Sequence, residues 1–144
     1  MPIRIVHTAD NHVGIAYQRY AGDPEVRARL IAERIEALKR VVAEANARQA
    51  HFLVVAGDLF DRPTVAQRDV KDVVAVLAGF AGTDVLVLPG NHDFYEGPQS
   101  SLWKTFRDAG WIYLLCNINY PLIFSEKGEE AANCDSMTRD TRLP

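Results

Sequence analysis

The sequence predicts an α/β fold with a mostly parallel β-sheet. Four short apolar runs have the length and the β-branched composition of strands, and segments with helical periodicity lie between them. This β-α-β-α-β-α-β order favours parallel strands, right-handed crossovers and helices on the faces of the sheet. One domain is expected, because 144 residues suffice for one and 48% hydrophobic residues can build its core.

The predicted strands share a bias toward Val, Ile and Leu and are residues 3–6, 52–56, 85–88 and 111–115. The run FLVVA (52–56) is apolar throughout, which is typical of a strand covered on both faces of its sheet. A further strand, PLIF (121–124), is expected within residues 119–144. An irregular tail is expected after it, because all periodicity ends after Gly128.

The first predicted helix is the longest and covers residues 22–50. Asp23 suits its N-cap, Pro24 suits the first helical position, and Glu25 suits the first turn. Apolar residues recur at steps of three or four and form one face. They are Val26, Leu30, Ile35, Leu38, Val42 and Ala45.

Two shorter helices are predicted between the later strands. Thr64 begins the first of them, with Gln67 placed three residues later for a capping box. Ser100 or Ser101 caps the second, and Gly110 ends it. Large aromatic residues near this helix are expected in the core; they are Trp103, Phe106 and Trp111.

Composition excludes several classes of protein. The net charge of −3 provides no global basic field for binding nucleic acid. Cys116 and Cys134 lack metal-ligand spacing, and two cysteines do not make a disulfide framework. The start of the sequence lacks the pattern of a signal peptide, and no apolar run has the ~20 residues of a membrane span, so a cytoplasmic protein is expected. Three arginines of the long helix are expected to face solvent: Arg27, Arg34 and Arg40.

Polar side chains follow three of the predicted strands, at the point where each strand ends. The first strand leads to Asp10 and His12, the second to Asp58, and the third to Asn91 and His92. Because ligands of open α/β sheets bind beyond the carboxyl ends of the strands, these side chains are expected to converge.

The residue types point to a metal centre. Carboxylate, imidazole and amide oxygen are ligands for Mn²⁺, Fe or Zn²⁺. Asp58 has two oxygens and can bridge two ions, which together hold a hydroxide and polarise a phosphoryl group. His92 beside the ions can stabilise developing charge or protonate a leaving oxygen. Gly57 and Gly90 let the backbone turn sharply and approach the ions.

Other polar residues have supporting or open roles. Asp61 and Asp93 are expected to bond loop backbone or to orient a neighbouring ligand. His7 and His51 are expected to be packed or capping histidines. The loop of residues 17–20, which carries two tyrosines, Gln18 and an arginine, either contacts substrate or is a plain surface loop.

Three motifs resemble the first blocks of the calcineurin-like metallophosphoesterases: DNH (10–12), GDLFD (57–61) and GNHD (90–93). Longer stretches are similar to one branch, the DNA repair exonucleases of the SbcD type, and the resemblance covers roughly residues 3–118. Those stretches are IRIVHTADNHVG (3–14), VVAGDLFDRPT (54–64) and GPQSSLWKTFRDAG (97–110).

The resemblance implies a four-layer α/β-β/α sandwich, of which this chain would supply the amino-terminal half. Residues 1–118 would form this incomplete metallophosphoesterase core, and residues 119–144 would add the extra strand and tail. Two divalent ions are implied, usually manganese. On the family pattern Asp10 and His12 bind the first ion, Asp58 bridges and Asn91 binds the second; His92 is the catalytic histidine. DNA as substrate and an SMC-like ATPase as partner are implied as well, and a homodimer stays open.

The sequence departs from the family pattern in its last third. That pattern continues with a lone His and a Gly-His-x-His block that supply further metal ligands, whereas this sequence has no histidine after His92. An amino-terminal fragment of a longer enzyme is therefore expected. Three functions stay open: a metal-dependent DNA exonuclease, a phosphatase or nucleotide phosphodiesterase with a small substrate, and a non-catalytic remnant that keeps the core of the fold.

Overall fold

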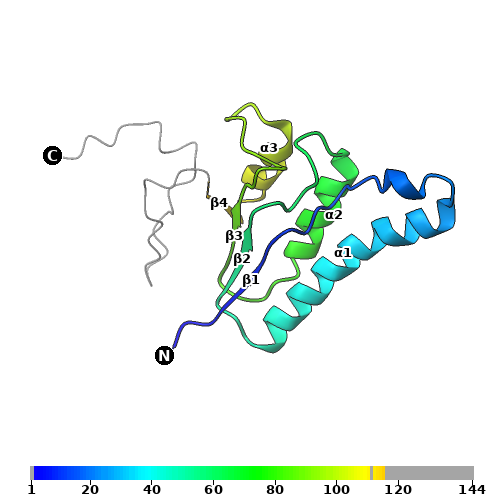
Figure 1. Cartoon of the computed structure of the whole chain (residues 1–144). Helices are drawn as coiled ribbons and strands as arrows, with labels where there is room; N and C mark the ends of the chain where they lie inside the picture. Colours follow the sequence, from blue (N-terminus) through cyan, green and yellow to red (C-terminus); the bar gives the residue numbers. More distant parts are fainter. Residues whose placement is uncertain (1, 111, 116–144) are drawn as a thin grey trace.

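The four strands form a single sheet in which every neighbouring pair is parallel. The structure is a computed structural model that describes residues 2–110 and 112–115 (Figure 1). The strands lie in the order of the sequence. They are β1 (Ile5–Thr8), β2 (Phe52–Ala56), β3 (Asp84–Leu88) and β4 (Ile112–Leu114). The predicted α/β class with a parallel sheet is confirmed.

Three α-helices connect the strands: α1 (Pro24–Ala47), α2 (Gln67–Leu77) and α3 (Ser101–Ala109). All three pack on the same face of the sheet (Figure 1). The reason is geometric, because each new strand is added on the same side of the previous one and each crossover is right-handed. A short 3₁₀-helix, η1 (Gln18–Tyr20), precedes α1.

The strands bury alternate residues, as expected when one face of a sheet meets helices. In β2, Leu53 and Val55 are buried, whereas Phe52 and Val54 on the other face are only half-buried. Strand β3 repeats this pattern with Val85 buried. The prediction that residues 52–56 are covered on both faces is therefore wrong for the part of the chain that the structure describes.

Phe60 joins the core to the loop that follows β2. Its ring is fully buried and makes edge contacts with Trp103 and Phe106 of α3, at centroid distances of 6.1 and 5.8 Å. These contacts confirm that Trp103 and Phe106 belong to the core; Trp111 lies outside the described residues. Burial of a side chain of this size is worth about 1.5–3 kcal/mol. The loop that carries the GDLFD motif is thus fixed by packing.

Helix α1 begins as predicted but packs over only part of its length. The carboxylate of Asp23 accepts a hydrogen bond from the backbone amide of Val26 at 3.1 Å, and Pro24 is the first helical residue. Residues of the second half of the predicted apolar face are buried, namely Leu38, Val42 and Ala45. Val26 is 37% exposed, and the first half of α1 extends beyond the sheet (Figure 1).

Several predicted boundaries are corrected by the structure. Strand β1 begins at Ile5 and not at residue 3. Helix α2 begins at Gln67 with Ala66 as its N-cap and no side-chain cap, so the predicted capping box at Thr64 is wrong. Gly110 ends α3 with a positive φ of 76°, as predicted. The predicted strand 121–124, the tail and both cysteines lie outside the described residues.

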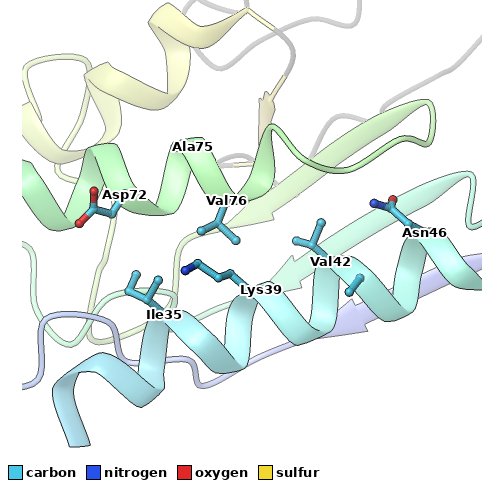
Figure 2. Close-up of a pocket in the computed structure, with 8 residues that line it drawn as sticks. Ile35, Lys39, Val42, Asn46, Asp72, Ala75 and Val76 are labelled. Atoms are coloured by element: carbon cyan, nitrogen blue, oxygen red, sulfur yellow. The ribbon is translucent and has the colours of Figure 1, made fainter. Parts of the chain in front are cut away.

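A groove of about 600 Å³ lies between α1 and α2 (Figure 2). Val76 of α2 and Lys39 and Val42 of α1 point into the space between the two helices, and Asp72 stands toward one end (Figure 2). Its lining holds one carboxylate and no histidine, so it lacks the donor set of a metal centre. The polar motifs lie elsewhere, at the carboxyl ends of the strands.

Candidate metal centre

The loops after β1 and β2 run side by side beyond the ends of their strands. The amide of Asp10 donates to Gly57 O at 3.2 Å, and the amide of His12 donates to Asp58 O at 3.0 Å. A parallel bridge between Val13 and Phe60 continues this pairing. The backbone therefore brings the DNH and GDLFD motifs together, as their positions at the sheet edge predict.

Three residues of these loops have left-handed backbone conformations although they are not glycine. Their φ angles are 54° for Asp10, 48° for His12 and 52° for Asp58. Such a conformation costs about 1–3 kcal/mol for each residue and persists where the surrounding structure enforces it, often at functional sites. All three coincide with predicted metal ligands.

His12 belongs to two clusters of metal-ligating side chains. In the first, ligand atoms of Asp10, His12 and Asp58 all lie within 4.8 Å of one another. In the second, the same holds for His12, Asp61 and His92. The separation is 3.8 Å between His12 Nε2 and Asp10 Oδ1 and 3.6 Å between His12 Nδ1 and Asp61 Oδ1. The rings of the two histidines meet edge to face, with centroids 4.7 Å apart.

Asp61 is the residue whose position sequence reasoning underestimated. Its expected role was to support a neighbouring ligand, but its carboxylate lies among the ligand atoms of the second cluster. The sequence carries no clear signal for this position, because it depends on how Phe60 fixes the loop to the core.

The imidazole of His12 fits a metal-binding role. Its Nδ1 is buried and has no hydrogen-bond partner among the described residues. A buried polar nitrogen without a partner is costly, and a bound cation removes that cost. This nitrogen lies beside the carboxylate of Asp61, and Nε2 of the same ring lies beside that of Asp10. Imidazole nitrogens and carboxylate oxygens together make the mixed donor set that suits Mn²⁺, Fe or Zn²⁺.

The carboxylate of Asp58 is oriented by the loop after β3. Its Oδ1 accepts a hydrogen bond from the backbone amide of His92 at 2.8 Å. Gly90 lies directly beneath it, so close that a Cβ at this position would come within 2.1 Å of Oδ1. Gly57 has a φ of 92°, a conformation that favours glycine. Both glycines thus shape the surroundings of Asp58.

Asp93 connects the loops after β2 and β3. It is fully buried, and its two oxygens accept hydrogen bonds from the amides of Gly90, at 2.6 Å, and Phe60, at 3.0 Å. Its own carbonyl accepts from Trp103 Nε1 at 2.9 Å. Burial raises the pKa of Asp93, the two amide bonds oppose this, and the charge of Asp58 adds to it. The prediction that Asp93 bonds loop backbone is confirmed.

His92 and Asn91 follow Gly90 on an exposed loop. His92 Nδ1 lies 3.1 Å from the carbonyl oxygen of Asp61. A carbonyl only accepts hydrogen bonds, so Nδ1 carries the proton and Nε2 faces away from this contact. Asn91 is exposed between Gly90 and His92, the two residues that orient Asp58.

The two remaining histidines lie apart from the clusters. His51 Nδ1 accepts a hydrogen bond from the backbone amide of Arg4 at 3.0 Å, which confirms its predicted capping role. His7 is exposed on β1 and is not packed within the described residues. No helix in the described ranges is long and apolar enough to cross a membrane.

Comparison with known proteins agrees with this geometry. Residues 3–142 match the calcineurin-like phosphoesterase family. The DNA double-strand break repair protein Mre11 of Methanosarcina acetivorans is 33% identical over 111 residues, which are 75% of this chain and 16% of that protein. The Mre11 of Archaeoglobus fulgidus is 32% identical over 115 residues, 78% of this chain and 22% of that protein. The chain thus spans about a fifth of the length of these relatives. With the motifs, the converging ligand clusters and the match over nearly all its residues, the chain belongs to the calcineurin-like phosphoesterase family.

Proposed function

We propose that this chain carries the first metal-binding part of a two-metal phosphodiesterase that acts on DNA. The observation that carries the proposal is the position of His12, which belongs to two clusters. Within each cluster the ligand atoms lie within 4.8 Å of one another. Two adjoining groups of carboxylate and imidazole side chains could supply ligands to two neighbouring cations. Relatives that are named for DNA double-strand break repair support DNA as the substrate.

Four residues would hold the metals in this proposal. Asp10 and His12 would bind the first ion, Asp58 would contribute to both sites, and Asn91 would contribute to the second. Asp61 is a further candidate because of its place in the second cluster. Manganese is the first candidate for this donor set, with Fe or Zn²⁺ as alternatives. Bound divalent ions would supply Lewis-acid polarisation of a phosphoryl group and a nucleophile at neutral pH.

Residues of this chain orient the carboxylate of Asp58 and can supply a proton to the leaving oxygen. The amide of His92 donates to Asp58 Oδ1 and so orients this carboxylate. The Asp61 carbonyl holds His92 Nδ1–H, so Nε2 of the same ring is the atom that can hold a proton for the leaving oxygen. Buried Asp93 keeps both loops in register, because its oxygens bind an amide of each.

Whole-protein properties belong to the proposal as well. An SMC-like ATPase partner is implied by the resemblance to the DNA repair branch, and a homodimer and a cytoplasmic location are proposed beside it. The chain spans 16–22% of the relatives cited above, so these properties concern the longer proteins that they represent.

Metal retention tests the proposal directly. The chain is equilibrated with Mn²⁺, freed of excess ion and analysed for metal content, beside Asp58→Asn and the control Asp72→Asn, whose carboxylate lies in the groove between α1 and α2. Retention by the wild type and the control, with loss in Asp58→Asn, supports the centre. Equal, near-zero content in all three contradicts it and favours a non-catalytic remnant.

Substrate choice separates the two hydrolase classes. A chain that holds Mn²⁺ is assayed with bis(p-nitrophenyl) phosphate, a diester, and with p-nitrophenyl phosphate, a monoester. Faster cleavage of the diester supports the phosphodiesterase. Cleavage of the monoester alone would instead identify a phosphatase.

A further inference from the structure

A second pocket adjoins the candidate metal centre and has no role in the proposed chemistry. Its volume is about 580 Å³. The lining residues that matter here are Tyr17, Arg19, Tyr20, Leu30, Asp61 and Arg62. It lies between η1, the overhanging first half of α1 and the loop after β2.

The side chain of Asp61 belongs both to the lining of the pocket and to the candidate metal centre. Its Oδ1 lies 3.6 Å from His12 Nδ1, inside the second ligand cluster. Its Oδ2 lies 3.6 Å from Arg62 Nη2, which lines the pocket. The pocket therefore opens beside the second ligand cluster, next to where a bound phosphate would lie.

The pocket is held in shape by two arginines of α1. Arg27 Nε donates to the carbonyl of Ala16 at 2.7 Å, and Arg34 Nε donates to the hydroxyl of Tyr17 at 2.7 Å. Tyr17 has a left-handed conformation, with φ 46° and ψ 49°, which these contacts help to maintain. Both arginines are half-buried, so the prediction that they face solvent is wrong; Arg40 is exposed as predicted. The first half of α1 thus supports the loop that carries Ala16 and Tyr17.

The lining combines aromatic faces with positive charge. The Arg19 guanidinium lies over the Tyr20 ring, 4.8 Å from its centroid, and the rings of Tyr17 and Tyr20 are 6.5 Å apart at an angle of 59°. Arg19 and Arg62 outweigh the single carboxylate of Asp61. Aromatic and guanidinium planes are the surfaces on which nucleic-acid bases stack, and arginine also binds phosphate.

We propose that this pocket receives the nucleotide next to the scissile phosphate, with its base against Tyr20 and its backbone against Arg62. The proposal rests on the proposed function and makes it more specific. A base can enter only if it is unstacked from its neighbours, so the preferred substrate is a single-stranded segment or a frayed end. A base-free phosphodiester would reach the metals but leave this pocket empty.

Binding of a base-containing and a base-free strand tests the pocket. The ligands are a short single-stranded oligothymidylate and an analogue of the same length in which every base is replaced by hydrogen, titrated into the 144-residue chain by calorimetry with Mn²⁺ present. Variants are Tyr20→Leu and Arg62→Gln, with Arg40→Gln as control, since Arg40 is an exposed arginine of α1 paired with Glu33. Circular dichroism verifies that each variant is folded.

The expected result is base-dependent binding. The wild type and Arg40→Gln bind oligothymidylate at least five-fold more tightly than the analogue, and Tyr20→Leu removes that difference. Arg62→Gln weakens both ligands, because it acts on the backbone. Equal affinity of the wild type for both ligands, or a base preference that survives in Tyr20→Leu, overturns the pocket.

Manganese content distinguishes this failure from failure of the metal centre. It is measured on the wild type and on Asp58→Asn in the same preparations. Mn²⁺ retention that depends on Asp58, with no base preference, supports the metal centre and contradicts the proposed role of the pocket. Base preference without Mn²⁺ retention supports the role of the pocket and contradicts the metal centre.

Discussion

The Asp58 carboxylate lies directly over the Cα of Gly90. A Cβ at residue 90 would meet Asp58 Oδ1 at 2.1 Å and the Asp58 amide nitrogen at 2.4 Å. Real Cβ atoms essentially never approach other atoms so closely, so the two motifs GDLFD and GNHD fit together only with glycine at this position. The glycine of the third motif thus determines where the carboxylate of the second one sits.

Gly90→Ala should therefore damage the metal centre although it removes no ligand. The new methyl group must push Asp58 or the loop after β3 away, which breaks the bond between Asp58 Oδ1 and the His92 amide. We expect at least a ten-fold loss of Mn²⁺ affinity, measured by calorimetry. Gly22→Ala is the matched control, since a Cβ there meets nothing within 4 Å. Unchanged affinity in Gly90→Ala would show that Asp58 is not a ligand.

His12→Ala should remove both ion sites together. His12 is the one histidine that belongs to both described ligand clusters, so its loss removes the nitrogen donor of the first cluster and leaves the second with only Asp61 and His92. We expect Mn²⁺ content to fall to the background level after removal of excess ion. His7→Ala serves as control, because His7 is exposed on β1. If His12→Ala still holds one ion per chain, the two clusters bind independently.

Asp93 should give the chain a distinctive pH dependence of stability. Burial raises the pKa of Asp93 above its ordinary value of 3.8, so the folded chain holds this proton more tightly than the unfolded chain does. Its contribution to the free energy of unfolding is therefore fully present below pH 3.8 and declines as the pH rises through the folded pKa. The buried anion then keeps the two amide bonds from Gly90 and Phe60 as its compensation.

Urea unfolding of the wild type and Asp93→Asn from pH 3.5 to 7 checks this expectation. Asparagine offers one acceptor oxygen where two amides donate, so we expect it to lower the free energy of unfolding by about 1–3 kcal/mol. The difference between the two proteins should shrink as the pH rises. Asp108→Asn, at an exposed position of α3, should show no such trend. A difference that widens with pH would mean that the charged form is the favoured one.

Much of this fold follows from local pattern. Strand 52–56 is bounded as predicted, and the cap of α1 at Asp23 forms as predicted, because hydrophobic periodicity and N-cap chemistry act over a few residues. The capping box at Thr64 failed since α2 begins three residues later, with Ala66 as its N-cap. Which face the helices cover depends on the order of the strands, and no single strand carries that information.

Part of the candidate site could likewise be predicted from the sequence, and part could not. The proximity of Asp10, His12 and Asp58 was predictable because polar residues follow the apolar runs, and parallel strands end at one edge. The place of Asp61 in the second cluster was not, since it depends on how Phe60 packs between Trp103 and Phe106. The half-buried arginines were missed for a related reason: Arg27 and Arg34 bind a loop 11 and 17 residues earlier in the chain, and helical periodicity does not record such contacts.

Arg34→Leu should loosen the loop of residues 11–20 without disturbing the sheet. The change removes the hydrogen bond to the Tyr17 hydroxyl, and with it the contact that holds Tyr17 in its left-handed conformation. We expect faster hydrogen exchange at the amides of Tyr20 and Ala21, which donate within this loop, and unchanged exchange in β2. Arg40→Leu, an exposed change on the same helix, should leave both regions as they are. Equal protection of the loop in Arg34→Leu would show that the loop, and the pocket beside the metal centre, keep their shape without the Arg34 contact.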